Sequence, residues 1–353
     1  MTTMSIAQGM GQIRLQRNRR LIRLWLYGVC LLVFAMVIVG GATRLTDSGL
    51  SITQWKPLLG AIPPLSQADW VAAFELYKQI PQYEQINKGM SLDEFKFIYW
   101  WEWGHRFLGR LIGLFVALPL AYFWLSGRLE DFLKPRLLIL FIAGGLQGVI
   151  GWWMVKSGLS ERVDVSQYRL AVHLTLACVI FAYAFWLARG LAQHSNEAYA
   201  NSARQFAAVL TIATVIQVFL GALVAGLNAG LSFNDWPLMD GAIIPGDLWV
   251  QSPAWINLFE NPKAVQFVHR LGAYTILFLA IGQMFVTYAS GNGETHKRRT
   301  VVFLLLVLAQ AALGVITLVL QVPLFWALVH QAGAVVLLGF AIAHWRGFKG
   351  AYA

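Results

Sequence analysis

Four histidines lie inside hydrophobic segments of the chain, each a few residues after an apparent outer loop. They are His105, His173, His269 and His330. A polar imidazole is costly in hydrocarbon, so such residues normally face a bundle interior or a cofactor. Four imidazoles at one depth can form two pairs of axial ligands, which makes haem the first cofactor to consider. Hydrogen bonding between helices is the alternative role for each histidine taken alone.

Eight hydrophobic segments are long enough to position these histidines in a membrane. The chain has 353 residues, of which 58% are hydrophobic and 12% charged, and this composition excludes an ordinary soluble domain. A spanning helix needs roughly 20 apolar residues. The qualifying segments cover approximately residues 22–42, 97–124, 137–155, 168–188, 205–227, 265–289, 300–321 and 323–343. We therefore expect an all-α integral membrane protein, with one histidine on each even-numbered span.

The charged residues predict the orientation of these spans. The net charge is +10, and the basic residues gather before the first span and after the second and sixth spans, whereas the alternate loops carry most of the acids. This positive-inside pattern predicts both termini in the cytoplasm and explains the basicity without a nucleic-acid partner. The short basic N-terminus shows neither a cleavage-site pattern nor a transit region. We therefore expect the inner (cytoplasmic) membrane of a bacterium rather than the mitochondrial inner membrane.

The sequence contains an internal duplication. Gly49-Leu50-Ser51 recurs 181 residues later as Gly230-Leu231-Ser232, and the span that follows each copy carries a second match, residues 104–109 against residues 268–272. Repeats of four spans keep the same orientation in a membrane. The repeat therefore predicts two tandem pseudo-symmetric four-helix bundles.

We expect residues 1–195 to form the first bundle and residues 196–353 the second. In each bundle, the second and fourth helices contribute one inward histidine, so the histidines form two separate pairs. Zinc and copper also bind histidine, but separate pairs argue against one tetrahedral site, and no cysteine or carboxylate completes a ligand set in the second half. Haem iron needs only two axial ligands and is the better fit.

The two halves differ beside the first histidine of each pair. Glu102 precedes His105 by three residues and shares its helical face, whereas Gln266 stands at the corresponding position of the second half. A carboxyl group beside an apolar pocket can exchange protons with a substrate. The alternative is a residue at the membrane boundary that faces water. An acid in one half only suggests one chemical site and one electron-transfer or structural site.

Arginines form a second group of candidates. Arg106 and Arg270 each directly follow a histidine. Their guanidinium groups could pair with haem propionates or extend to lipid headgroups. Arg44, at the end of the first span, is a further candidate for the first site, and Ala225 takes its place in the repeat.

Structural roles are expected for the remaining polar and small residues. Cys30 and Cys178 lie inside spans and are expected to be buried rather than joined in a disulfide. His194, His296 and His344 are expected to be solvated. The third span carries four glycines that should allow close packing. They are Gly144, Gly145, Gly148 and Gly151.

Several motifs together form a signature that extends over essentially the whole chain. They are Gly40-Gly41-Ala42-Thr43-Arg44-Leu45-Thr46, Ser48-Gly49-Leu50-Ser51, Trp55-Lys56-Pro57, Glu102-Trp103-Gly104-His105-Arg106, Trp236-Pro237, His269-Arg270 and His330-Gln331. Their combination resembles the haem A synthase family. The first outer loop contains no cysteine, so the resemblance is to the branch of the family that lacks a cysteine pair there.

The resemblance implies an oxidoreductase that converts haem O to haem A. The C8 methyl group of haem O would become a formyl group through a hydroxymethyl intermediate. A haem b cofactor would be held in the C-terminal half by His269 and His330. Haem O would bind as substrate in the N-terminal half, at His105 and His173, with Glu102 as the acidic catalytic residue.

The resemblance also implies partners. These are membrane lipid, the farnesyltransferase that makes haem O and the assembly of cytochrome oxidase, while a homo-oligomer is left open. Two other functions stay open from the residues alone. A di-haem b-type membrane cytochrome for quinol-linked electron transfer would hold two similar haems and would not need Glu102. A haem transporter or assembly factor without chemistry would release its haem unmodified.

Overall fold

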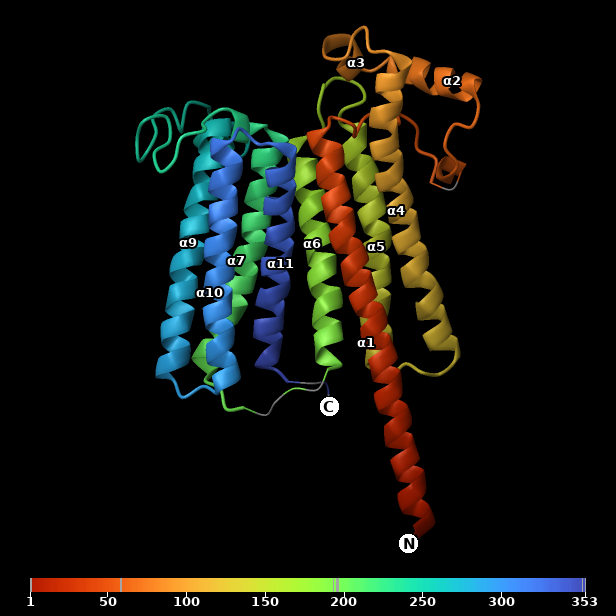
Figure 1. Ribbon diagram of the computed structural model, residues 1–353, viewed down its shortest axis with the longest axis vertical. Helices are drawn as coiled ribbons and strands as arrows, with labels where there is room; N and C mark the ends of the chain where they lie inside the picture. Colours follow the sequence, from red (N-terminus) through yellow and green to blue (C-terminus); the bar gives the residue numbers. More distant parts are fainter. Residues whose placement is uncertain (1, 58, 193, 195–196, 351, 353) are drawn as a thin grey trace.

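The computed structural model describes residues 2–57, 59–192, 194, 197–350 and 352, and eight of its helices are long and apolar enough to cross a membrane. Figure 1 shows them side by side. They are α1 (Thr2–Leu45), α4 (Leu92–Leu125), α5 (Leu133–Lys156), α6 (Gln167–Gly190), α7 (Asn201–Gly226), α9 (Pro262–Ala289), α10 (Glu294–Val319) and α11 (Leu324–Gly347). The expected all-α class and the eight expected spans are confirmed.

Local capping fixes where the two helices that carry His105 and His269 begin. Ser91 and Glu94 form a capping box at the start of α4, in which each side chain bonds to the backbone amide of the other residue. At the start of α9, Asn261 caps the first amides and Pro262 occupies the first helical position. Each helix therefore begins at a defined residue on the outer side of its histidine.

The long helices pack as two rings of four. In the first ring, α1 and α5 each contact both α4 and α6, and in the second, α7 and α10 each contact both α9 and α11. α6 contacts α7 and α11, and α1 contacts α11, so these four helices join the rings (Figure 1). The division into two bundles at residues 1–195 and 196–353 stays a prediction. Pseudo-symmetry stays a prediction, and residues 195 and 196, where we placed the boundary, lie outside the described residues.

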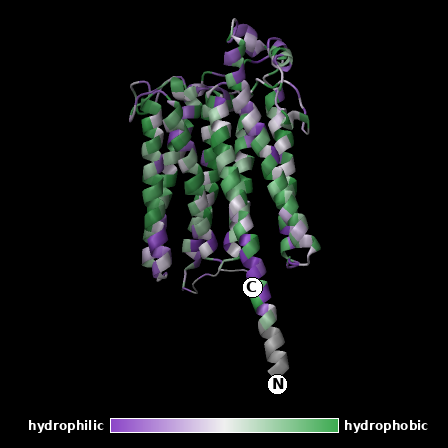
Figure 2. Ribbon diagram, turned by 45° about the vertical axis from the view of Figure 1, so that its right-hand side comes forward, coloured by the Kyte–Doolittle hydropathy of each residue, from purple (hydrophilic) through white to green (hydrophobic). Residues whose placement is uncertain are grey.

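The largest apolar core among the described residues lies between α1, α4, α5, α6 and α11. Leu26, Leu133, Leu187 and Leu338 are fully buried in it. Cys30 and Cys178 belong to the same core and are not joined in a disulfide, as expected. Figure 2 shows hydrophobic residues along the middle of the helices and more polar residues toward both ends, as burial in a bilayer requires.

Short helices cover the end of the bundle opposite to the chain termini (Figure 1). Those between α1 and α4 are η1 (Leu59–Ala61), α2 (Gln67–Tyr77) and α3 (Pro81–Gln85). Those between α7 and α9 are η2 (Ala229–Leu231), η3 (Ala254–Ile256) and α8 (Asn257–Glu260). These two outer segments lie over the ends of α4 and α9 that precede their histidines.

Candidate haem-binding sites

The structure brings the four histidines together as two pairs. His105 on α4 is close enough to His173 on α6 to interact electrostatically, and His269 on α9 is close enough to His330 on α11 to do the same. The two helices of each pair stand opposite each other in their ring. All four side chains are half-buried, so each ring keeps surface that a ligand could cover. This arrangement fits a flat group held between two imidazoles.

A glycine on a neighbouring helix lies against each histidine ring. The four contacts are Gly40 with His105, Gly151 with His173, Gly221 with His269 and Gly314 with His330. A Cβ atom added to any of these glycines would lie only 2.9 or 3.0 Å from a ring atom. Each ring can therefore take its position only because its neighbour has no side chain.

Three glutamines that were not predicted from the sequence accompany these glycines. Gln147, Gln217 and Gln310 each precede a ring-contacting glycine by four residues. The signal was available, because Gln-x-x-x-Gly recurs on three of the four odd-numbered spans. Met36 takes the glutamine's place on the first span.

Glu102 is buried, with 2% of its surface exposed, and both of its oxygens accept hydrogen bonds. Oε2 accepts from the Ser51 hydroxyl at 2.7 Å and from the Ile52 amide at 2.6 Å. Oε1 accepts from Nε of Arg106 at 3.0 Å and from Nη2 at 2.5 Å. The alternative position, facing water at the membrane boundary, is wrong because the outer segment folds over the carboxylate.

Gln266 occupies the matching place in the second half with the opposite hydrogen-bond polarity. Its amide nitrogen donates to the carbonyl oxygens of Ala229 at 2.9 Å and Phe233 at 3.2 Å. Its amide oxygen accepts from Nη2 of Arg270 at 3.0 Å. Apart from the arginine that follows each residue, the carboxylate of Glu102 thus faces two hydrogen-bond donors of its outer segment, whereas the amide of Gln266 faces two acceptors.

Arg106 and Arg270 each donate hydrogen bonds to backbone carbonyl oxygens of the outer segment above their helix. Beyond its bonds to Glu102, Arg106 donates to the carbonyl oxygens of Ile52 at 2.6 Å and Gln54 at 3.1 Å. Arg270 donates to the carbonyl oxygens of Phe233 at 3.1 Å and Leu238 at 2.9 Å. A propionate would therefore compete with these carbonyls, and the pairing of either arginine with haem stays a prediction.

Arg44 connects the outer ends of the two halves. It donates to Asp47 at 3.1 Å and, across the interface, to the side-chain oxygen of Asn228 at 3.0 Å. Its Nη2 atom also lies 3.5 Å from a carboxylate oxygen of Asp164. These contacts give Arg44 a role in joining the halves, and its place at the first site stays a prediction.

Two of the three histidines that we expected to be solvated are buried. His296 and His344 are 3% and 2% exposed. The His296 ring stacks on Phe348 with centroids 4.2 Å apart, and Nε2 of His344 lies 3.1 Å from the Gln283 amide nitrogen. The expectation was wrong because Phe348, just after α11, packs against both imidazole rings. His194 is half-buried, with Nε2 2.7 Å from the Arg189 carbonyl oxygen.

The packing role expected for the α5 glycines is wrong at three of the four positions. A Cβ atom at Gly144, Gly145 or Gly148 would meet no heavy atom within 4 Å among the described residues. Gly151 alone contacts another helix, through the ring of His173.

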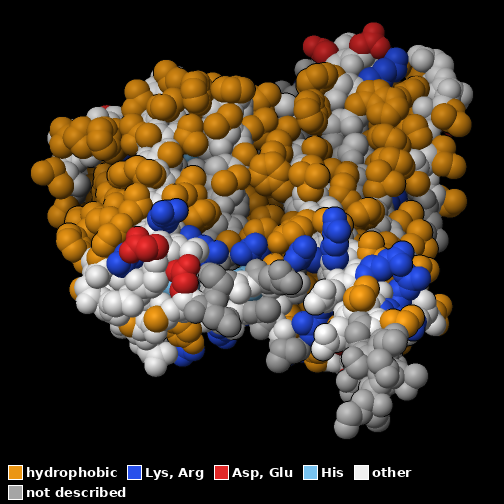
Figure 3. Space-filling model, turned by 60° about the horizontal axis from the view of Figure 1, so that its bottom comes forward, with side chains coloured by type: hydrophobic (Ala, Val, Ile, Leu, Met, Phe, Trp, Pro, Cys, Tyr) orange, Lys and Arg blue, Asp and Glu red, His pale blue; other side chains and the backbone are white. Residues whose placement is uncertain are grey.

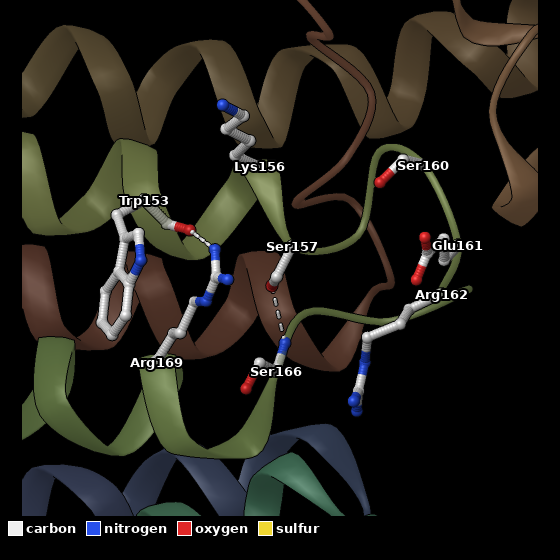
Figure 4. A pocket seen from close by; sticks show the side chains of 8 residues that line it. All are labelled: Trp153, Lys156, Ser157, Ser160, Glu161, Arg162, Ser166 and Arg169. Carbon is white, nitrogen blue, oxygen red and sulfur yellow. Dashed lines mark hydrogen bonds between the residues drawn. The ribbon is translucent and has the colours of Figure 1, made fainter.

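A basic pocket of about 490 Å³ opens at the loop between α5 and α6, shown in Figure 4. It is lined by Trp153, Lys156, Ser157, Ser160, Glu161, Arg162, Ser166 and Arg169. Arg169 donates to the Trp153 carbonyl oxygen at 2.6 Å, and its guanidinium lies 4.6 Å from the centre of a Trp153 ring. Arg169 precedes His173 by four residues, so the two share one face of α6. Three cations against one carboxylate would attract an anionic group to this side of the first histidine pair.

The eight long apolar helices define a multi-pass membrane protein. A sequence model of the COX15-CtaA family, described as Cytochrome oxidase assembly protein, matches residues 23–342. The chain belongs to this family.

Relatives of high similarity carry one name. The chain is 62% identical over 340 residues to Heme A synthase of Sinorhizobium medicae, covering 96% of this chain and 93% of the relative. It is 60% identical over 338 residues to Heme A synthase of Agrobacterium fabrum, with the same two coverages. It is 58% identical over 346 residues to Heme A synthase of Brucella ovis, covering 98% of this chain and 97% of the relative.

Proposed function

We propose that this chain is a haem A synthase, an oxidoreductase that converts the C8 methyl group of haem O to the formyl group of haem A. The observation that carries the proposal is an identity of 58% to 62% with relatives named Heme A synthase, over at least 96% of this chain. Two non-equivalent histidine pairs support it, because the reaction needs one site for a substrate and one for a redox cofactor.

His269 and His330 hold a haem b cofactor in this proposal, and His105 and His173 receive haem O. The fit is supported by half-buried rings against glycines in both halves. It is supported also by Nδ1 of His173, which is buried without a hydrogen-bond partner among the described residues and leaves that ring free to adjust to a substrate. When bound, haem b supplies one-electron redox chemistry.

Glu102 is the proposed catalytic acid–base residue, one helical turn from His105. It takes up a proton that the substrate methyl group releases on oxidation, or stabilises the positive charge that develops there. Hydrogen bonds from Ser51, Ile52 and Arg106 support the role, because they hold the carboxylate in one orientation beside the first pair only.

We propose the cytoplasmic membrane of a bacterium as the location, with both termini in the cytoplasm and the outer segments on the opposite side. Figure 3 supports this orientation, because Lys and Arg side chains border the apolar surface at the end that holds the termini. Lys134 and Arg136 at the start of α5, and Arg298 and Arg299 near the start of α10, belong to that end.

Single histidine variants test the assignment of the two sites. In cells that make haem O, purified His269→Ala should lack haem B, whereas His105→Ala should keep haem B and form no haem A. His194→Ala, outside the spans, is the control and should resemble wild type. Equal loss of haem B from His105→Ala and His269→Ala, or from neither, would contradict the assignment.

A further inference from the structure

Two glutamines contact the histidines of the C-terminal pair in the same way. The amide nitrogen of Gln217 on α7 lies 3.0 Å from Nδ1 of His269 and donates to the carbonyl oxygen of His269 at 2.8 Å. The amide nitrogen of Gln310 on α10 lies 3.1 Å from Nδ1 of His330 and donates to the carbonyl oxygen of His330 at 2.8 Å. Each glutamine therefore spans the side chain and the backbone of one histidine.

Glycines provide the space for both amides. The amide oxygen of Gln217 lies 2.1 Å from where a Cβ atom of Gly272 would be, and that of Gln310 lies 2.2 Å from the same place at Gly333. Each of these glycines follows its histidine by three residues. A His-x-x-Gly motif on one helix thus packs against a Gln-x-x-x-Gly motif on its neighbour. The glycine of the first motif makes room for the glutamine amide, and the glycine of the second contacts the imidazole ring.

The amide oxygens of Gln217 and Gln310 are buried and accept no hydrogen bond from the described residues. Buried polar atoms are normally paired, so each oxygen is an unused acceptor beside an imidazole. A histidine that binds iron through Nε2 carries its proton on Nδ1 and donates it to a nearby acceptor. The amide oxygen could accept from Nδ1–H if the amide rotated and also moved away from the histidine carbonyl oxygen, which its nitrogen contacts at 2.8 Å. The histidine carbonyl oxygen lies within a helix and keeps its helical partner.

The N-terminal pair lacks these contacts. Gln147 donates to the carbonyl oxygen of His173 at 3.0 Å, and its amide oxygen is unpaired like those of Gln217 and Gln310, but Nδ1 of His173 has no partner among the described residues. On α1, the position 181 residues before Gln217 is Met36, whose thioether has no proton to donate. The two histidine pairs are therefore held differently.

We infer that Gln217 and Gln310 are positioning residues, which fix the tautomer and ring orientation in which His269 and His330 bind iron. This inference rests on the proposed function, which places haem b in the C-terminal half. The contacts make that half the site that retains its haem. The N-terminal pair, whose Nδ1 atoms make no hydrogen bond to an amide of the described residues, suits a porphyrin that enters as substrate and leaves as product.

Methionine substitutions test the inference, because Met36 shows that this side chain fits the corresponding place on α1. Purified full-length Gln217→Met and Gln310→Met should lose haem B to a scavenging apoglobin roughly 10–100-fold faster than wild type. The midpoint potential of the remaining haem B should rise, because Nδ1–H loses its acceptor. Gln217→Glu keeps an acceptor, so it should retain haem B and lower the potential. Gln147→Met is the matched control and should leave haem B retention unchanged.

The inference would be overturned if both methionine variants kept the wild-type retention, spectrum and midpoint potential of haem B. It would also be overturned if the midpoint potential of Gln217→Glu rose as that of Gln217→Met does. His269→Ala separates this result from failure of the proposed function. Haem B that persists in His269→Ala would show that the haem b site itself is misplaced. Haem B lost from His269→Ala but retained normally by the glutamine variants would overturn only the positioning role.

Discussion

Glu102 carries a carboxylate where Gln266 carries an amide. The carboxylate accepts hydrogen bonds from the segment that it faces, and the amide nitrogen donates to backbone carbonyl oxygens. Substituting Gln at position 102 would remove the charge that pairs with Arg106. It would also turn an amide nitrogen toward either the Ser51 hydroxyl and Ile52 amide or the arginine. The glutamate therefore has a structural effect that must be separated from its proposed chemical one.

Glu102→Gln should abolish haem A formation and destabilise the protein by roughly 1–3 kcal/mol, because hydrogen bonds to a buried charge are lost. Ser51→Ala removes one of the same bonds but leaves the carboxylate. It should lower stability while haem A still forms. Thermal unfolding and haem A yield, measured on the same samples, check both expectations. Wild-type haem A formation by Glu102→Gln would show that the catalytic role is wrong.

Asp235 gives the second outer segment a dependence on pH. The amides of Gly241 and Asp240 donate to its carboxylate at 3.0 and 3.1 Å and hold the pKa of Asp235 below its usual range. These bonds stabilise the folded segment fully above the unfolded pKa of about 3.9 and are lost as pH falls through the lower folded value. The protection of the Gly241 amide against hydrogen exchange, relative to the intrinsic rate at each pH, should fall over that range in wild type. In Asp235→Asn the same amides should have low protection at every pH. A pH profile of protection like that of wild type in this variant would contradict the role of Asp235.

At the scale of the helix, α5 offers a matched comparison between two glycines three residues apart. Gly151→Ala would bring a Cβ atom 2.9 Å from Cε1 of His173, so the ring must move, at a cost of roughly 1–3 kcal/mol. Gly148→Ala meets nothing within 4 Å among the described residues and should change stability by less than about 1 kcal/mol. Haem A yield should fall only in Gly151→Ala, and equal yields in the two variants would contradict the contact.

The spans were predictable because eight apolar segments of sufficient length leave little choice of structure in a bilayer. The repeat predicted one histidine on the second and one on the fourth span of each half. The glycine contacts did not, because a glycine against another helix and a glycine facing outward look alike in sequence, as Gly151 and Gly148 show. Similarly, the spacing of Glu102 and Arg106 permits an ion pair, but only the fold shows which loop carbonyls complete it.

Across the whole molecule, α1 and α11 connect the two histidine pairs. Gln331, next to His330, donates to the carbonyl oxygen of Val37 at 2.8 Å. Val37 precedes by three residues the glycine that contacts His105. The interface between the halves therefore runs directly beside both sites.

Gln331→Leu should weaken this interface by about 1 kcal/mol, the usual net contribution of a hydrogen bond, without loss of haem B. Thermal unfolding of the purified protein and its haem B content are the measurements. Arg44→Ala, which removes only the more exposed bonds at the outer end, is the comparison and should cost less than about 1 kcal/mol. Loss of haem B from Gln331→Leu at unchanged stability would show that Gln331 acts on His330 instead.

The most direct test of the central claim is to extract the haems with acid–acetone from wild-type protein purified from cells that make haem O, and to identify them by mass. A haem A synthase should yield haem B together with haem A or hydroxylated haem O. Haem B alone, at two per chain, would contradict the claim and indicate a di-haem b-type cytochrome.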